Sequence, residues 1–143
     1  MYEHFIVPVD LSERNTAAVE TAKEFALLTN GRVTLLHVIE TLDLPYEEMA
    51  EFYKRLEDEA ATKLDGVCET LVASGLEFER HILLGDPATE IVEFAAQSSD
   101  SLIVLRSHSV DPSAPTHGWA TLSYKLAILA TSPILLVKDG VAA

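Results

Sequence analysis

The chain has 143 residues, which is enough for one domain with a sizeable hydrophobic core. Hydrophobic residues make up 48% of it and charged residues 23%, a composition typical of a folded globular protein rather than a disordered one. The 23 acidic residues outnumber the 10 basic ones and give a formal net charge of -13, which repels nucleic-acid backbones and anionic lipids and argues against direct binding to either.

The amino-terminal segment predicts a buried strand followed by a helix. Residues 5–9 form a short apolar run that ends at Asp10, and Pro8, which cannot donate to a ladder, is expected at the end of the strand. Ser12 is a suitable N-cap for the helix, whose apolar residues recur at helical spacing as far as the closing Asn-Gly pair at 30–31.

A second strand and a long amphipathic helix come next. Residues 33–38 are almost continuously apolar, as expected for a strand buried on both faces in a parallel sheet. The helix is predicted to begin near 44–45 and to end at Gly75. Its apolar stripe steps by three or four residues through Met49, Phe52, Leu56, Ala60, Leu64, Val67 and Leu71. Cys68 is the only cysteine, which excludes an internal disulfide and predicts a buried, inert thiol.

The following segment predicts a strand, a capped helix and another strand. The strands are expected at 78–84 and 102–105. Between them, Asp86 is the expected N-cap of a helix with Pro87 at its first position. The inner face of this helix is expected to comprise Ile91, Phe94 and Ala95.

The last segment predicts a loop, a helix and a fifth strand. The loop covers about 106–117, the helix 118–130 and the strand 134–137. The core-facing residues of this helix are expected to be Leu122, Leu126 and Leu129.

Strands and helices thus alternate along the chain, which predicts the α/β class. We expect a single three-layer α/β/α domain over 1–143, with a five-stranded parallel sheet of order 3-2-1-4-5. Such sheets bind ligands at the carboxyl ends of their strands, at the switch point between the first and fourth strands. The residues of interest there are Asp10, Val38 and 106–109. Asp10 is either a ligand contact or a cap on the loop before the first helix.

The sequence lacks the common catalytic and metal-binding patterns. It contains no G-x-G-x-x-G, no G-x-x-x-x-G-K-[ST] and no G-x-S-x-G. None of the five histidines stands at metal-ligand spacing from another histidine or a cysteine, so no metal site is expected. The Ser-His-Ser run at 107–109 predicts a polar loop, since adjacent residues rarely face one another as nucleophile and base. We therefore predict no catalytic residues and a binding or regulatory function rather than an enzyme.

A phosphoacceptor receiver domain has a similar architecture but requires a different set of acidic residues. It needs an acidic pair after the first strand and an aspartate after the third. Here Asp10 stands alone and Gly85 directly follows the third strand, so this class is excluded.

Six short sequence motifs, found in order along nearly the whole chain, together point to one family. They are 6–12 (IVPVDLS), 35–38 (LLHV), 85–88 (GDPA), 107–108 (SH), Lys125 and 132–137 (SPILLV). Through them the chain resembles the universal stress protein family. The resemblance implies a five-stranded parallel sheet of order 3-2-1-4-5, usually a homodimer and, in one group of members, binding of adenine nucleotides.

The nucleotide-binding members resemble the pattern G-x2-G-x9-G-[ST] after the fourth strand. Its glycines let the backbone approach the phosphates, which the amides at the next helix N-terminus hold. Here Arg106 and Ser109 occupy the first two glycine positions. The third falls on Trp119 counting forward or on Ala120 counting back from Lys125 and Pro133, and in the second register Thr121 matches the final Ser/Thr.

This sequence matches the family at positions that contact adenosine and departs from it at positions that contact the phosphates. Asp10 and Val38 match positions that resemble the family's adenosine contacts. The candidate nucleotide-contacting residues are Asp10, Val38, Arg106, Ser107, Ser109 and Thr121. The expected function is a stress-response binding or regulatory module with weakened or absent nucleotide binding. Two other readings remain: an ATP- or AMP-binding universal stress protein in which Arg106 replaces the glycine loop, and an adenine-nucleotide hydrolase, for which no base or metal-ligand set is present.

Assembly and location follow from the same patterns. Residues 134–137 form an apolar sheet edge that can pair with a second copy about a two-fold axis, so a homodimer is expected unless the carboxyl-terminal tail covers that edge. No apolar run approaches the roughly 18 residues that span a bilayer, and no signal-peptide pattern follows Met1. The expected location is the cytoplasm.

Overall fold

A computed structural model describes residues 1–41, 46–107 and 122–138, and shows the predicted five-stranded parallel sheet. Its strands are β1 (His4–Pro8), β2 (Arg32–Glu40), β3 (Glu77–Gly85), β4 (Ser101–Ser107) and β5 (Ile134–Lys138). The strand order is β3-β2-β1-β4-β5 and every neighbouring pair is parallel, which confirms the predicted order 3-2-1-4-5. The switch point therefore lies between β1 and β4.

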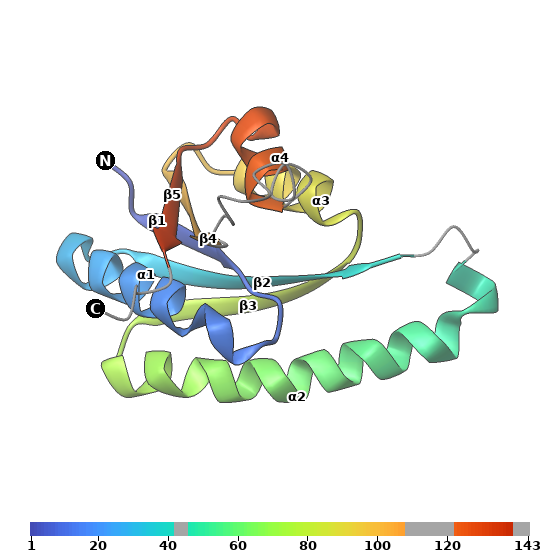
Figure 1. Cartoon of the computed structure of the whole chain (residues 1–143). Coiled ribbons are helices and arrows are strands. Elements are labelled where there is room, and N and C mark those ends of the chain that lie inside the picture. Colours follow the sequence, from blue (N-terminus) through green and yellow to red (C-terminus); the bar gives the residue numbers. More distant parts are fainter. Residues whose placement is uncertain (42–45, 108–121, 139–143) are drawn as a thin grey trace, which may run out of the picture.

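Two helices cover each face of the sheet. Helices α1 (Thr16–Thr29) and α2 (Ala50–Ser74) lie on one side, and α3 (Pro87–Ala95) and α4 (Leu122–Leu129) lie on the other (Figure 1). Two short 3-10 turns, Glu13–Asn15 and Tyr46–Glu48, precede α1 and α2. This is the three-layer arrangement expected from alternating strands and helices.

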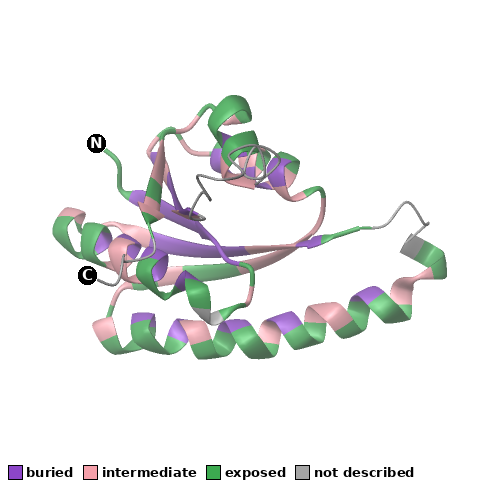
Figure 2. Ribbon diagram, viewed as in Figure 1, coloured by how far each residue is buried: buried purple, intermediate pink, exposed green. Residues whose placement is uncertain are grey.

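The central strands are apolar because both of their faces are buried. Along β1, Phe5 and Val7 pack into the α1/α2 layer, whereas Ile6 packs into the α3/α4 layer. The same alternation separates Leu35 from Leu36 on β2. The buried residues accordingly concentrate in the middle of the sheet (Figure 2). Side chains that alternate across a doubly covered sheet produce the continuous apolar runs in the sequence.

The predicted helix ends are largely confirmed. Asn30 and Gly75 adopt left-handed backbone conformations, with φ of 54° and 74°, and close α1 and α2. Asp86 caps α3 by accepting a hydrogen bond from the Thr89 backbone N–H, with Pro87 in the first turn. Ser12 differs from its prediction, since it caps the 3-10 turn that precedes α1 rather than the α-helix itself.

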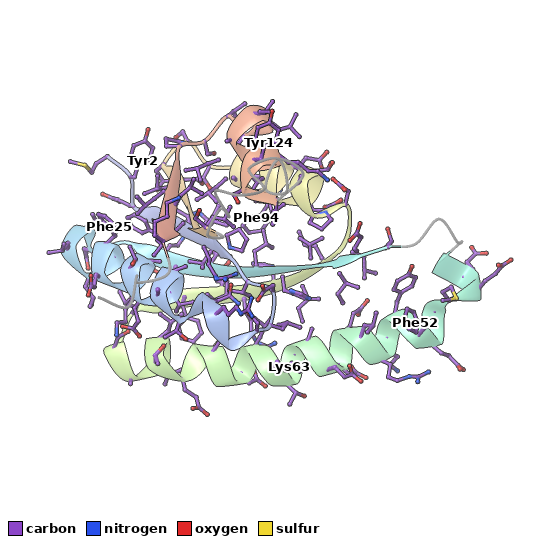
Figure 3. The ribbon with its side chains drawn as sticks, viewed as in Figure 1. Tyr2, Phe25, Phe52, Lys63, Phe94 and Tyr124 are labelled. Atoms are coloured by element: carbon purple, nitrogen blue, oxygen red, sulfur yellow. The ribbon has the colours of Figure 1, made fainter. Side chains whose placement is uncertain are left out.

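The apolar stripe of α2 is shifted from its predicted phase at the amino-terminal end. The buried residues of this helix are Tyr53, Ala60, Leu64, Cys68 and Leu71, so the predictions for Leu64, Leu71 and Cys68 are confirmed. Phe52 is 39% exposed and Leu56 is only half-buried, so the prediction that both lie in the core is wrong. Figure 3 shows Phe52 toward the amino-terminal end of α2.

A similar correction applies to α4. Leu126 is fully buried as predicted, but Leu129 is 55% exposed because it lies in the last turn, beside the open edge strand.

In the part of the chain described, no helix combines the length and the apolar composition needed to cross a membrane.

Candidate functional site

A cavity of about 160 Å³ opens at the carboxyl ends of β1, β2 and β4, at the switch point of the sheet. Of the six residues selected from the sequence, Asp10, Val38 and Arg106 line it. Ser107 is described but does not line it, and Ser109 and Thr121 lie outside the described residues. Three of the four candidates that the structure describes therefore line one cavity.

Asp10 is fixed by the loop that follows β1. Its Oδ1 accepts hydrogen bonds from the Ser12 backbone N–H at 2.9 Å, the Ser12 hydroxyl at 2.6 Å and the Asn15 side-chain amide at 2.6 Å. Asp10 Oδ2 has no hydrogen-bond partner among the described residues. Asp10 therefore caps its own loop with one oxygen, as one of the two predictions for it stated, and its second oxygen remains available at the cavity.

The carboxyl group of Asp10 is held in its charged form. Partial burial opposes ionisation, but the hydrogen bonds from Ser12 and Asn15 and the positive charge of Arg106 outweigh it and hold the pKa of Asp10 below its ordinary value. A charged acceptor makes stronger hydrogen bonds than a neutral one, so the unpaired oxygen suits hydroxyl or amino donors on a ligand.

Asn15 is a site residue that the sequence reasoning missed. It is buried, lines the cavity, and donates from its side-chain amide both to Asp10 and to the Ser12 carbonyl at 3.1 Å. Between Asp10 and Ser12, Leu11 has a φ of 69°, an uncommon conformation for a branched side chain that this hydrogen-bonded loop maintains. A polar residue five positions after Asp10, in the first turn of a predicted helix, was the available signal.

His37 ties the ends of β1 and β2 together beside Val38. Its Nδ1 lies 2.7 Å from the Val9 carbonyl oxygen, and because a carbonyl only accepts, Nδ1 carries the hydrogen. This contact holds the two strand ends side by side where the cavity opens. Val38 supplies an apolar wall to that opening.

Arg106 and Ser107 point to opposite faces of β4. The neighbours of Arg106 at alternate positions pack into the α1/α2 layer, so Arg106 points toward that layer at the end of β4. Ser107 is buried and its hydroxyl accepts a hydrogen bond from Lys138 Nζ on β5 at 3.0 Å. Ser107 therefore links β4 to β5, which its position in the sequence did not reveal.

The cavity combines two oppositely charged side chains, one carboxylate and one guanidinium, with apolar walls. Among the described residues, no group of three or more histidine, cysteine, aspartate or glutamate side chains could hold a metal ion.

Comparison with known proteins agrees with the fold and with the family resemblance noted in the sequence. The family model of the universal stress proteins matches residues 1–137. The chain belongs to the universal stress protein family. The universal stress protein YxiE of Bacillus subtilis is 25% identical, over 96% of this chain and all of the relative.

Solved structures of universal stress proteins share the same architecture. That of MJ0577 from Methanocaldococcus jannaschii superposes with a TM-score of 0.82 and 27% identity, covering 97% of each chain. A universal stress protein from Archaeoglobus fulgidus, solved in complex with dAMP, superposes with a TM-score of 0.70 and 22% identity over 96% of this chain and 98% of its own. At that identity the second likeness establishes the fold alone.

Proposed function

We propose that this universal stress protein is a cytoplasmic binding or regulatory module that keeps an adenosine-type pocket but binds adenine nucleotides weakly or not at all. The observation that carries the proposal is the contrast between the two sides of one cavity. Asp10 offers an unpaired, charged carboxylate oxygen beside Val38, whereas the side chain of Arg106 stands where the nucleotide-binding pattern has glycine.

The Asp10 side is suited to a nucleoside. A carboxylate oxygen accepts hydrogen bonds from the hydroxyl groups of a ribose, and the apolar wall formed by Val38, Leu36 and Ile91 can accommodate a flat base. The dAMP complex of the Archaeoglobus fulgidus protein supports the idea that this fold can hold such a ligand.

The Arg106 side is poorly suited to a phosphate chain. A glycine there would let backbone amides approach an anion, and a long side chain occupies that space instead. The cavity of about 160 Å³ is smaller than the roughly 300–1,000 Å³ of a typical small-molecule site. The net charge of -13 adds a salt-screened penalty for a polyanion.

Calorimetric titration of adenosine, AMP and ATP into nucleotide-free protein tests the proposal. We expect ATP to bind no better than adenosine in the wild type, and the double variant Arg106→Gly/Ser109→Gly to bind ATP at least about tenfold more tightly. Arg55→Gln, on the exposed side of α2, is the matched control for loss of a positive charge. Mass spectrometry of the denatured supernatant checks independently for co-purified nucleotide.

A second candidate function, nucleotide binding through Arg106, is favoured by the position of that side chain. The charge of Arg106 acts on Asp10, so the guanidinium lies close enough to the cavity to serve as a phosphate partner. In that case the wild type binds ATP or AMP at micromolar concentration, and Arg106→Gln abolishes the binding. That pair of results would overturn the first proposal in favour of an arginine-dependent nucleotide site.

We also propose that the protein forms a homodimer through β5. In the described structure β5 is an edge strand, paired only with β4, and Leu136 on it is 39% exposed. Ile128 and Leu129 on the neighbouring helix α4 are 63% and 55% exposed. An apolar edge strand beside exposed apolar side chains favours pairing with a second copy.

A further inference from the structure

The α3/α4 side of the sheet is covered only in part. Helix α3 has nine residues and spans about 13 Å, whereas β2 and β3 have nine residues each and span about 30 Å. The helix packs over the carboxyl half of these strands, where Leu36, Leu83 and Ile91 meet. Within residues 1–41, 46–107 and 122–138, no helix lies above the amino half of the same face.

A second cavity occupies this uncovered half, at the opposite end of the strands from Asp10. It measures about 460 Å³. Its strand residues include His4, Arg32, Glu77, Glu79 and His81, and Phe94, Gln97 and Ser98 border it from α3 and the segment that follows. Figure 3 shows Phe94 below α3, over the sheet. Most of these residues are charged or polar, in contrast to the apolar carboxyl half.

His4 anchors one side of this cavity. It is only 5% exposed, and its Nε2 lies 2.7 Å from the Thr34 hydroxyl while its Nδ1 lies 3.4 Å from an Arg32 guanidinium nitrogen. A guanidinium only donates, so Nδ1 is the acceptor and Nε2–H donates to Thr34. His4 therefore holds one nitrogen of Arg32 and leaves the other donors of that guanidinium available.

Positive and negative groups face the same cavity without pairing. Arg32 stands directly opposite Glu77 in the β2–β3 register, and Glu79 follows on the same face. No ion pair joins Arg32 to either carboxylate, and Glu79 instead contacts His81, with Oε2 at 3.1 Å from Nε2. The hydrogen bond from His81, together with more distant charges that include Arg32, holds the pKa of Glu79 below its ordinary value. The cavity therefore presents a cationic pole and an anionic pole that remain separate.

We propose that this cavity binds a small zwitterion, a free α-amino acid, with its carboxylate on Arg32 and its ammonium group against Glu77 and Glu79. A guanidinium matches a carboxylate with two parallel hydrogen bonds, and an ammonium group has three donors for the carboxylates. The adjacent rings of His81 and Phe94, with centroids 5.2 Å apart, form a surface for the ligand side chain. A ligand with one charge would satisfy one pole and be repelled by the other.

The test uses the full chain and three probes that differ in one group each. L-phenylalanine carries both charges, phenethylamine lacks the carboxylate, and 3-phenylpropanoate lacks the ammonium group. In heteronuclear NMR titrations we expect saturable shifts of the amides of Arg32, Glu79 and His81 with L-phenylalanine, and binding at least about tenfold weaker with either half-ligand. Adenosine should not compete, since Asp10 lies at the other end of β1.

Variants distinguish a site from an ordinary charged surface. Arg32→Gln and Glu79→Gln should each weaken L-phenylalanine binding at least about tenfold while leaving the dispersion of the spectrum intact. Arg80→Gln is the matched control, because Arg80 points to the other face of β3 and pairs with Asp65 at 3.1 Å, and it should leave binding unchanged. The proposal is overturned if L-phenylalanine gives no saturable shifts, if a half-ligand binds equally well, or if Arg80→Gln weakens binding as much as Arg32→Gln.

Discussion

At the scale of single residues, His4 stands out as a histidine kept neutral inside the sheet. Burial is the main cause of its lowered pKa, and the charge of Arg32 acts in the same direction. Asp100 and Glu79 oppose the shift and His81 adds to it. A neutral His4 accepts from Arg32 and donates to Thr34, and a second proton would place two positive groups in contact.

This arrangement predicts acid-sensitive stability. Because the folded pKa lies below the ordinary value of 6.5, the unfolded chain takes up the proton first as the pH falls. The contribution of His4 to the free energy of unfolding is complete above pH 6.5, decreases below it, and levels off below the folded pKa. The loss is about 1.4 kcal/mol for each unit by which the pKa is lowered. Urea unfolding from pH 7.5 to pH 5 measures it.

His4→Gln supplies the control. A glutamine amide can donate to Thr34 and its oxygen can accept from Arg32, but it does not titrate. The variant should therefore lose less stability than the wild type between pH 7 and pH 5. Equal slopes in the two proteins would contradict the assignment to His4.

At the scale of elements, α2 contains a glycine that nothing in the fold requires. Gly66 lies in the middle of the helix, and a Cβ added to it would meet no atom within 4 Å. Glycine in a helix interior costs about 0.5–1 kcal/mol relative to alanine. Gly66→Ala should raise the free energy of unfolding by that amount in chemical denaturation.

Gly75 makes the contrasting control at the end of the same helix. Its φ of 74° lies in the left-handed region, so alanine there is strained even though the space around it is open. Gly75→Ala should lower the free energy of unfolding by roughly 1–2 kcal/mol. If both substitutions shift stability in the same direction, the description of α2 and its cap is wrong.

The elements themselves could be predicted because their signals are local. Asp86, Pro87 and Gly75 mark helix ends by their own chemistry, and burial on both faces makes the central strands continuously apolar. The phase of α2 could not be fixed, because Phe52 and Tyr53 are adjacent aromatic residues and only the position of the helix over the sheet decides which is buried.

The candidate site was predicted less completely, because some of its contacts form only in the folded sheet. Asp10, Val38 and Arg106 follow strands, so topology alone places them together. The contacts of Asn15 with Asp10 and of Lys138 with Ser107 depend on loop conformation and strand register. These are properties of the assembled sheet, and no local pattern encodes them.

At the scale of the whole molecule, the proposed dimer predicts a sharp response to charge at the β5 edge. Leu136 is half-exposed on β5, whereas its neighbour Leu135 packs into the core, so Leu136→Lys tests the edge without disturbing the interior. We expect the wild type to sediment as a dimer at micromolar concentration and Leu136→Lys as a monomer.

Val72→Lys on α2 is the matched control. Val72 is 64% exposed and lies on the helix layer away from β5, so this change should leave the sedimentation coefficient unchanged. A monomeric wild type, or a Leu136→Lys variant that remains dimeric, would contradict assembly through this edge.

The central place of β1 also has a consequence for synthesis on the ribosome. Residues 4–8 are translated before either neighbouring strand, and they pair on one side with residues 32–36 and on the other with β4 at 101–103. Long-range contacts of this kind slow folding, because the chain between the two strands must be closed into a loop before they can pair. The β1–β2–β3 half can form while the nascent chain is still growing, but one edge of its oldest strand stays unpaired until β4 has left the exit tunnel. During that interval the unpaired edge of β1 can pair with another chain, which favours aggregation.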